Sequence, residues 1–201
     1  MRQGPMKEKP MRLIVLLLLM PTALLAQPRL IEPWQVLTSI TAEWNNDGTQ
    51  DRAVLIQNPD DISADLALYL GNSDTLAMDE VAYLPEIVWS GAMWGQQPDL
   101  NLLENESLQL HSMNIAIGRN RWHEILTIAY RDEHFVVAGY TYDSYDTLDL
   151  DAGGSCDVNY LTGRAEVAPA KGQHRTISLV AGAVALGDWS PALIPDNCIP
   201  E

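Results

Sequence analysis

The 201-residue chain carries 12 Lys and Arg against 27 Asp and Glu, which gives a formal net charge of −15. That charge repels phosphate backbones and anionic lipid head groups, so we expect no nucleic-acid partner. Hydrophobic residues make up 47% of the chain, which excludes a disordered body, and the length fits one domain with a buried core.

The first residues have the pattern of a secretory signal peptide. Four basic residues precede an apolar run from Leu13 to Ala26, which is short and ends in a small residue. This pattern predicts cleavage after Ala26, whereas Pro21 and the small-residue exit disfavour the alternative of a membrane anchor. Gln27 stands where a lipoprotein needs a cysteine. We therefore expect residues 1–26 to be removed and the mature protein to be periplasmic or secreted, with no stable membrane anchor.

The segment that follows, residues 33–41, is predicted to form a short helix or an irregular approach to the first strand. Its apolar residues fall at helical spacing, on one side of such a helix. They are Trp34, Val36, Leu37 and Ile40.

Residues 43–51 have oxygen-bearing residues at every second position, as in a calcium-binding loop. Calcium takes about six to eight oxygen ligands, and a glycine at loop position six permits the sharp turn. Gly48 has that position, but Val54 stands where an EF-hand needs its bidentate glutamate, so the loop leads into a strand instead. The alternative is a metal-free turn, because Asn-Asp-Gly is a strong turn signal by itself. The predicted calcium ligands are Glu43, Asn45, Asp47, Thr49 through its carbonyl, and Asp51.

Two stretches resemble known families. Residues 42–55, continuing to 65–74, resemble one FG-GAP or VCBS-type repeat, and the similarity covers about residues 40–76. Such repeats are blades of β-propellers whose acid-rich loop binds calcium; here Glu43 replaces the usual Asp, and no second loop of this spacing follows. Residues 122–166 resemble the C-terminal part of uncharacterised exported bacterial proteins that pair such a loop with a β-rich tail, which implies no activity.

The remainder of the chain is typical of an all-β, mostly antiparallel fold arranged as a sandwich, a meander or a blade-like curled sheet. β-branched and aromatic runs alternate with turn signals, and no βαβ rhythm is present. Arg131-Asp132-Glu133 is a short polar connection that predicts a hairpin between its neighbouring strands. The predicted strands are 52–57, 64–70, 79–84, 107–117, 122–130, 134–142, 156–161, 164–168 and 174–186.

Two cysteines, Cys156 and Cys198, are expected to form a disulfide, because an even count in an exported chain favours a bridge. The alternative is a reactive Cys156 nucleophile, although no histidine lies nearby in sequence. The four histidines lack the close spacing of a zinc site, and we interpret them as isolated. They are His111, His123, His134 and His174.

Two further features have a functional and an ordinary interpretation. The acids Asp143, Asp146, Asp149 and Asp151 form either a solvated loop or a weak second cation site or docking surface for a basic partner. Trp89 and Trp94 lie beside glycines, where they either line a carbohydrate or peptide groove or supply aromatic core that a chain with one Phe otherwise lacks.

The sequence therefore predicts an exported, calcium-stabilised β domain, residues 27–201, with a binding or accessory role towards a protein or carbohydrate and no catalysis. Calcium is expected to be structural. One alternative is a periplasmic hydrolase that uses carboxylates from Glu43–Asp51 and Asp143–Asp157. Another is an acidic inhibitor or immunity-type protein that binds a basic partner.

Overall fold

The computed structural model describes Met1, residues 30–196 and Cys198. The chain divides into two units, Met1–Leu30 and Ile31–Glu201, and the strands belong to the second. Apart from Met1, the predicted signal peptide lies outside the described residues. In the part that is described, no helix has the length and apolar character needed to cross a membrane.

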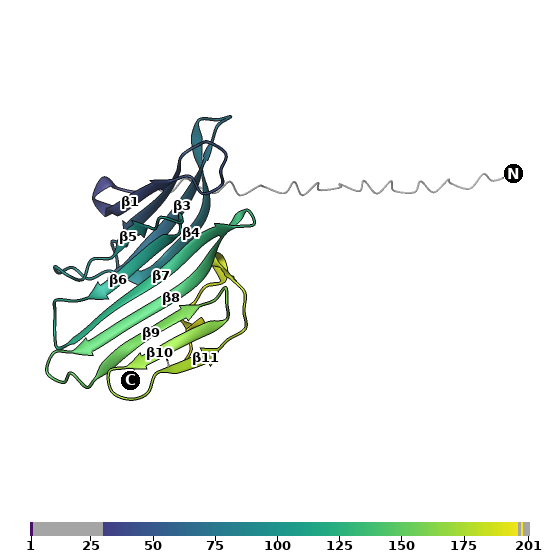
Figure 1. Cartoon of the computed structure of the whole chain (residues 1–201). Coiled ribbons are helices and arrows are strands. Elements are labelled where there is room, and N and C mark those ends of the chain that lie inside the picture. Colours follow the sequence, from purple (N-terminus) through teal and green to yellow (C-terminus); the bar gives the residue numbers. More distant parts are fainter. Residues whose placement is uncertain (2–29, 197, 199–201) are drawn as a thin grey trace. The chain divides into compact units, whose positions relative to one another are not determined.

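Two antiparallel sheets make up the second unit, and the predicted all-β fold is confirmed (Figure 1). Each sheet is a meander in which consecutive strands pair with one another. The first sheet contains β1 (Val36–Ala42), β2 (Asp51–Gln57), β3 (Ser63–Asn72) and β4 (Ala77–Trp89). The second contains β5 (Asp99–Leu102), β6 (Leu108–Asn114), β7 (Asn120–Arg131), β8 (His134–Asp146), β9 (Gly153–Asn159), β10 (Arg164–Pro169) and β11 (Arg175–Ser178), with β12 (Val184–Ala185) paired to β8.

One hydrophobic core lies between the sheets, because each sheet turns one face inward. On β6, Leu108 and Leu110 are fully buried, whereas Gln109 between them is only partly buried. This alternation follows from the two-residue period of a strand. Leu66 of the first sheet and Val137 of the second belong to the same buried cluster, so the two sheets pack face to face.

The prediction of a short helix or irregular segment at 33–41 is wrong for residues 36–41. Only Pro33–Gln35 is helical, as a single 3₁₀ turn (η1), and the chain then continues as strand β1. Pro33 suits a first turn, but the β-branched residues that follow favour an extended backbone. β1 pairs with β2 through residues 36–42, and this pairing outweighs the helical spacing of the apolar side chains.

The β7–β8 hairpin is confirmed. Arg131 pairs with His134, which leaves Asp132 and Glu133 as a two-residue loop. Both have positive φ, 50° and 66°, as a type I′ turn requires. Elsewhere the predicted boundaries change: β5 was not predicted, β9 begins three residues before the predicted strand, and the stretch 174–186 is two short strands, β11 and β12.

Residues 184–196 and Cys198 return to the inner face of the second sheet. They form the C-terminal segment, which contains β12 and the 3₁₀ turns η2 (Leu186–Asp188) and η3 (Pro191–Leu193). Its Trp189 ring lies 5.7 Å from that of Tyr160, whose hydroxyl donates to the Leu193 carbonyl at 3.2 Å. The predicted disulfide between Cys156 and Cys198 is confirmed, with Cα atoms 5.1 Å apart.

Candidate functional site

The predicted calcium loop connects β1 to β2, and Asp51 fixes its end to the protein. The Asp51 side chain is fully buried. One carboxylate oxygen accepts the Trp44 N–H at 2.6 Å, and the other accepts the Gly71 N–H at 2.9 Å. Buried carboxylates need such partners, and bonds to a charged acceptor are strong. Asp51 therefore joins the start of the loop to the end of β3.

The middle of the loop is organised by Asp47, which is exposed. One oxygen of its carboxylate accepts both the N–H and the hydroxyl of Thr49, and the other accepts the Asn45 amide at 2.8 Å. Its own N–H lies 3.1 Å from Glu43 Oε1 and 3.2 Å from Asn45 Oδ1. The Thr49 hydroxyl bond, followed by the bonds from the Thr49 N–H and the Asn45 amide, lowers the pKa of the Asp47 carboxyl. Asp47 is therefore held as a carboxylate.

Two glycines allow this loop conformation for different reasons. Gly48 has φ +85°, a left-handed conformation that favours glycine, and the space around it is open. Gly71 is required by close packing, because a Cβ there would lie 2.6 Å from the Gln50 carbonyl oxygen and 2.9 Å from the Thr49 Cβ. The turn and the approach of the loop to β3 both depend on glycine.

The residues of this loop carry the types of oxygen ligand that calcium prefers. Oxygens from Glu43 and Asn45 converge on the Asp47 amide, beside the Asp47 carboxylate, and carboxylate and amide oxygens are calcium ligands. Among residues 30–196 and 198, no three His, Cys, Asp or Glu side chains gather as a metal site. A calcium ion here would therefore use the Asn45 amide, backbone carbonyls and water beside the carboxylates. Ligation by Thr49 and Asp51 stays a prediction.

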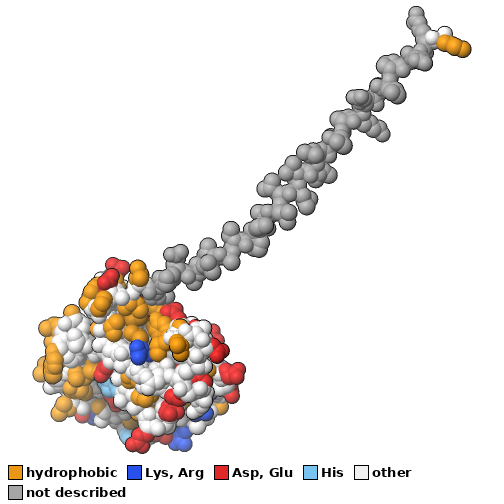
Figure 2. Space-filling view, turned by 90° about the horizontal axis from the view of Figure 1, so that it is seen from above, with side chains coloured by type: hydrophobic (Ala, Val, Ile, Leu, Met, Phe, Trp, Pro, Cys, Tyr) orange, Lys and Arg blue, Asp and Glu red, His pale blue; other side chains and the backbone are white. Residues whose placement is uncertain are grey.

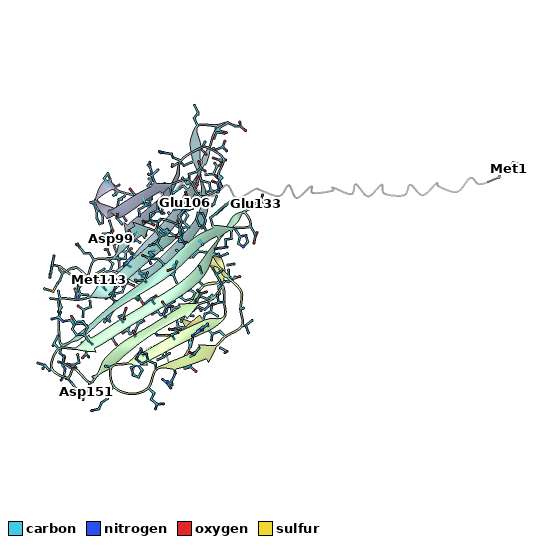
Figure 3. The ribbon with its side chains drawn as sticks, viewed as in Figure 1. Met1, Asp99, Glu106, Met113, Glu133 and Asp151 are labelled. Carbon is cyan, nitrogen blue, oxygen red and sulfur yellow. A yellow bond between two sulfur atoms is a disulfide. The ribbon has the colours of Figure 1, made fainter. Side chains whose placement is uncertain are left out.

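The second acidic cluster is divided among several partners. Asp146 pairs with Arg119 at 2.6 Å and accepts the Leu148 N–H at 2.8 Å. The hydrogen bond from Arg119, followed by the one from Leu148, lowers the pKa of Asp146. Asp151 pairs with Lys171 at 2.8 Å in the loop after β8 (Figure 3). Ion pairs and a turn thus account for the carboxylates of Asp146 and Asp151.

The two tryptophans that suggested a groove have different surroundings. Trp89 lies at the end of β4, where its ring is 5.5 Å from that of Trp122. Trp94 is 83% exposed in the following loop. Trp89 is thus part of an aromatic pair, and the surface at Trp94 stays a candidate for the predicted carbohydrate or peptide contact.

The structure brings together two histidines that were predicted to be isolated. His111 on β6 and His123 on β7 lie with Nδ1 and Nε2 2.9 Å apart and with stacked rings. They face away from the core, and Asp99 and Asp143 lie opposite them on β5 and β8; Asp99 marks the β5 edge in Figure 3. Burial is the main cause that lowers the pKa of both histidines. When both rings are neutral, one ring can donate its N–H to the unprotonated nitrogen of the other.

No protein-family model, curated protein or solved structure matches the chain. The resemblance of residues 40–76 to an FG-GAP or VCBS repeat therefore stays a prediction.

Proposed function

We propose that this protein is an exported β domain, stabilised by calcium in its β1–β2 loop, that has a binding or accessory role. The observation that carries the proposal is the convergence of Glu43 and Asn45 oxygens on the Asp47 amide, next to the Asp47 carboxylate. Calcium there would cross-link the loop and fix the direction in which β2 begins. An affinity of about 10⁻⁴–10⁻³ M is typical of extracellular calcium modules.

Two properties of the chain support export and binding. A disulfide is present, and disulfides persist in oxidising compartments. Acidic side chains are spread widely over the face shown in Figure 2, and basic side chains are few there, which favours cationic or basic partners. The carboxylates named for the alternative hydrolase have separate structural partners. Asp51 accepts backbone N–H groups in a buried position, and Asp157 accepts a hydrogen bond from the Thr141 hydroxyl.

Thermal unfolding with calcium and with chelator tests the calcium site. A ligand that binds only the folded state raises its stability, so about 10 mM calcium should raise the unfolding temperature by roughly 3–10 °C at the affinity expected above. Asp47→Ala should abolish this rise, and Asp60→Ala, which removes an exposed carboxylate from the β2–β3 turn, should retain it. An Asp47→Ala loss of equal size with calcium and with chelator would show that the loop is a metal-free turn.

A further inference from the structure

A cavity of about 120 Å³ lies between the two sheets and the C-terminal segment. β4 and the inner face of the second sheet form two of its walls, and residues after β12 form a third. The walls are largely apolar, and one carboxyl group, that of Glu124, faces the cavity. Its other lining residues include Val88, Leu110, Leu126, Trp189 and Ile194.

Glu124 lies on the inner face of β7, where the two-residue alternation of the strand predicts an apolar core residue. It stands between Ser112 on β6 and Tyr142 on β8. The Tyr140 hydroxyl donates to Glu124 Oε2 at 3.0 Å. The Ser112 hydroxyl donates its hydrogen to the Trp89 carbonyl at 2.9 Å. Burial raises the pKa of Glu124 above its ordinary value.

Among the described residues, Glu124 forms no ion pair with a basic side chain. The ion pairs in this part of the chain join other residues. A carboxylate in apolar surroundings is costly unless a charge or several donors compensate it. Here only neutral hydroxyls lie beside it: that of Tyr140 donates to it, and that of Ser112, also within reach, donates to the Trp89 carbonyl. An apolar side chain would fill this position at lower cost. A partly buried carboxyl group that faces a cavity and has no ion-pair partner is a candidate ligand-binding group.

We propose that this cavity binds a small primary amine, whose ammonium group pairs with the Glu124 carboxylate and whose apolar part contacts Leu110, Leu126 and Ile194. Four observations point to this class of ligand. An ammonium ion supplies the missing counter-charge. The Trp189 ring in the wall can add a cation–π contact. The net charge of −15 attracts cations and repels anions. The volume suits a ligand of about benzene size or less, since an apolar cavity of about 150 Å³ binds benzene.

This site is separate from the calcium loop, and neither proposal depends on the other. The loop connects β1 to β2 and contributes no residue to the cavity walls. Amine binding should therefore persist in the presence of chelator and in Asp47→Ala.

Calorimetric titration of the full-length protein with isobutylamine and with isobutanol, which has the same shape but no charge, tests the site. At pH 8 we expect isobutylamine to bind at least tenfold more tightly than isobutanol. Glu124→Gln keeps the size of the side chain and an oxygen that can accept from Tyr140. This variant should bind isobutylamine at least tenfold more weakly than the native protein does, and its affinity for isobutanol should be unchanged. Glu104→Gln, which removes an exposed carboxylate, should change neither affinity.

A second variant tests the place of binding without changing the carboxyl group. Ile194→Trp should fill the cavity from the C-terminal segment and abolish amine binding, while thermal unfolding confirms that the protein is folded. Equal affinities for amine and alcohol, or full amine affinity in Glu124→Gln, would overturn the proposal. Full amine affinity in Ile194→Trp, or no heat of binding up to roughly 10 mM amine, would do the same.

Discussion

Two aspartates of the β1–β2 loop have different roles although they lie four residues apart. Asp47 is exposed and gathers loop groups that fit a cation, whereas Asp51 is buried and accepts two backbone N–H groups from outside the middle of the loop. The first arrangement gives calcium a place to bind, and the second holds the loop to β3 whether or not calcium is present.

Asp51→Asn should therefore destabilise the protein by about 2–3 kcal/mol, because an amide accepts at only one of its two ends and places N–H donors against a backbone N–H at the other. Urea unfolding with chelator measures this loss, which should be present without calcium; ligation by Asp51 would add a further loss when calcium is present. Asp60→Asn, in an exposed turn, is the control and should change stability by less than about 0.5 kcal/mol. A loss that appears only with calcium would instead make Asp51 a ligand.

At this scale, the sequence predicted contacts that are local and missed those between strands. The alternate spacing of residues 43–51 brings Glu43, Asn45 and Asp47 together because all three belong to one turn. The surroundings of Glu124, in contrast, come from β6, β8 and the C-terminal segment, which are distant in sequence. Its one sequence signal is its position between Trp122 and Leu126, where the two-residue period of a strand calls for an apolar side chain.

Strands were predicted where residue type and turn signals agreed, and missed where pairing decided the structure. The β7–β8 hairpin has both β-prone strands and a polar two-residue loop. β5 is only four residues long and alternates acid and amide with leucine, and it is a strand because it pairs with β6. The same cause makes β1 a strand despite its helical spacing. Strand pairing is non-local, which is why propensity alone does not settle it.

The pairing of β6 with β7 also creates the His111–His123 contact, and this contact should make stability depend on pH. Burial lowers the pKa of both rings below the ordinary 6.5, while Asp99 and Asp143 act in the opposite direction. Between the lowered pKa values and about 6.5, the unfolded chain binds more protons than the folded one. The stability from this pair is therefore complete above about pH 6.5 and is lost as the pH falls through the folded-state values.

Urea unfolding at pH 7.5 and 5.5 measures this dependence. The native protein should lose more stability between these pH values than the variant His111→Gln/His123→Gln. Glu124, whose raised pKa has the opposite effect, is present in both proteins and cancels in the comparison. His174→Gln removes an exposed histidine and should behave as the native protein. Identical pH dependence in native protein and double variant would contradict a role for the pair.

At the scale of the whole domain, the C-terminal segment covers a part of the core that the two meanders leave uncovered. Apart from β12, which pairs with β8, each strand pairs with a neighbour in sequence, so most of the sheet structure is set by consecutive hairpins. The inner face of β8 to β10 is covered instead by residues from the end of the chain, which supply Leu186, Trp189 and Cys198 to the core. The disulfide holds Cys198 against β9, and Trp189 and Ile194 of the same segment line the cavity that Glu124 faces.

Removal of the disulfide should therefore affect both stability and amine binding. Cys156→Ala/Cys198→Ala should lower the free energy of unfolding by about 2–5 kcal/mol, since a bridge across 42 residues restricts the unfolded chain. Because Trp189 and Ile194 line the cavity, a looser C-terminal segment should also weaken isobutylamine binding at a temperature where the variant is still folded. A thiol reductant should reproduce both effects in the native protein and add nothing in the double variant. Lower stability with unchanged amine affinity would mean that the segment keeps its place without the bridge, held by the contacts of Trp189 and the hydrogen bond from Tyr160 to Leu193.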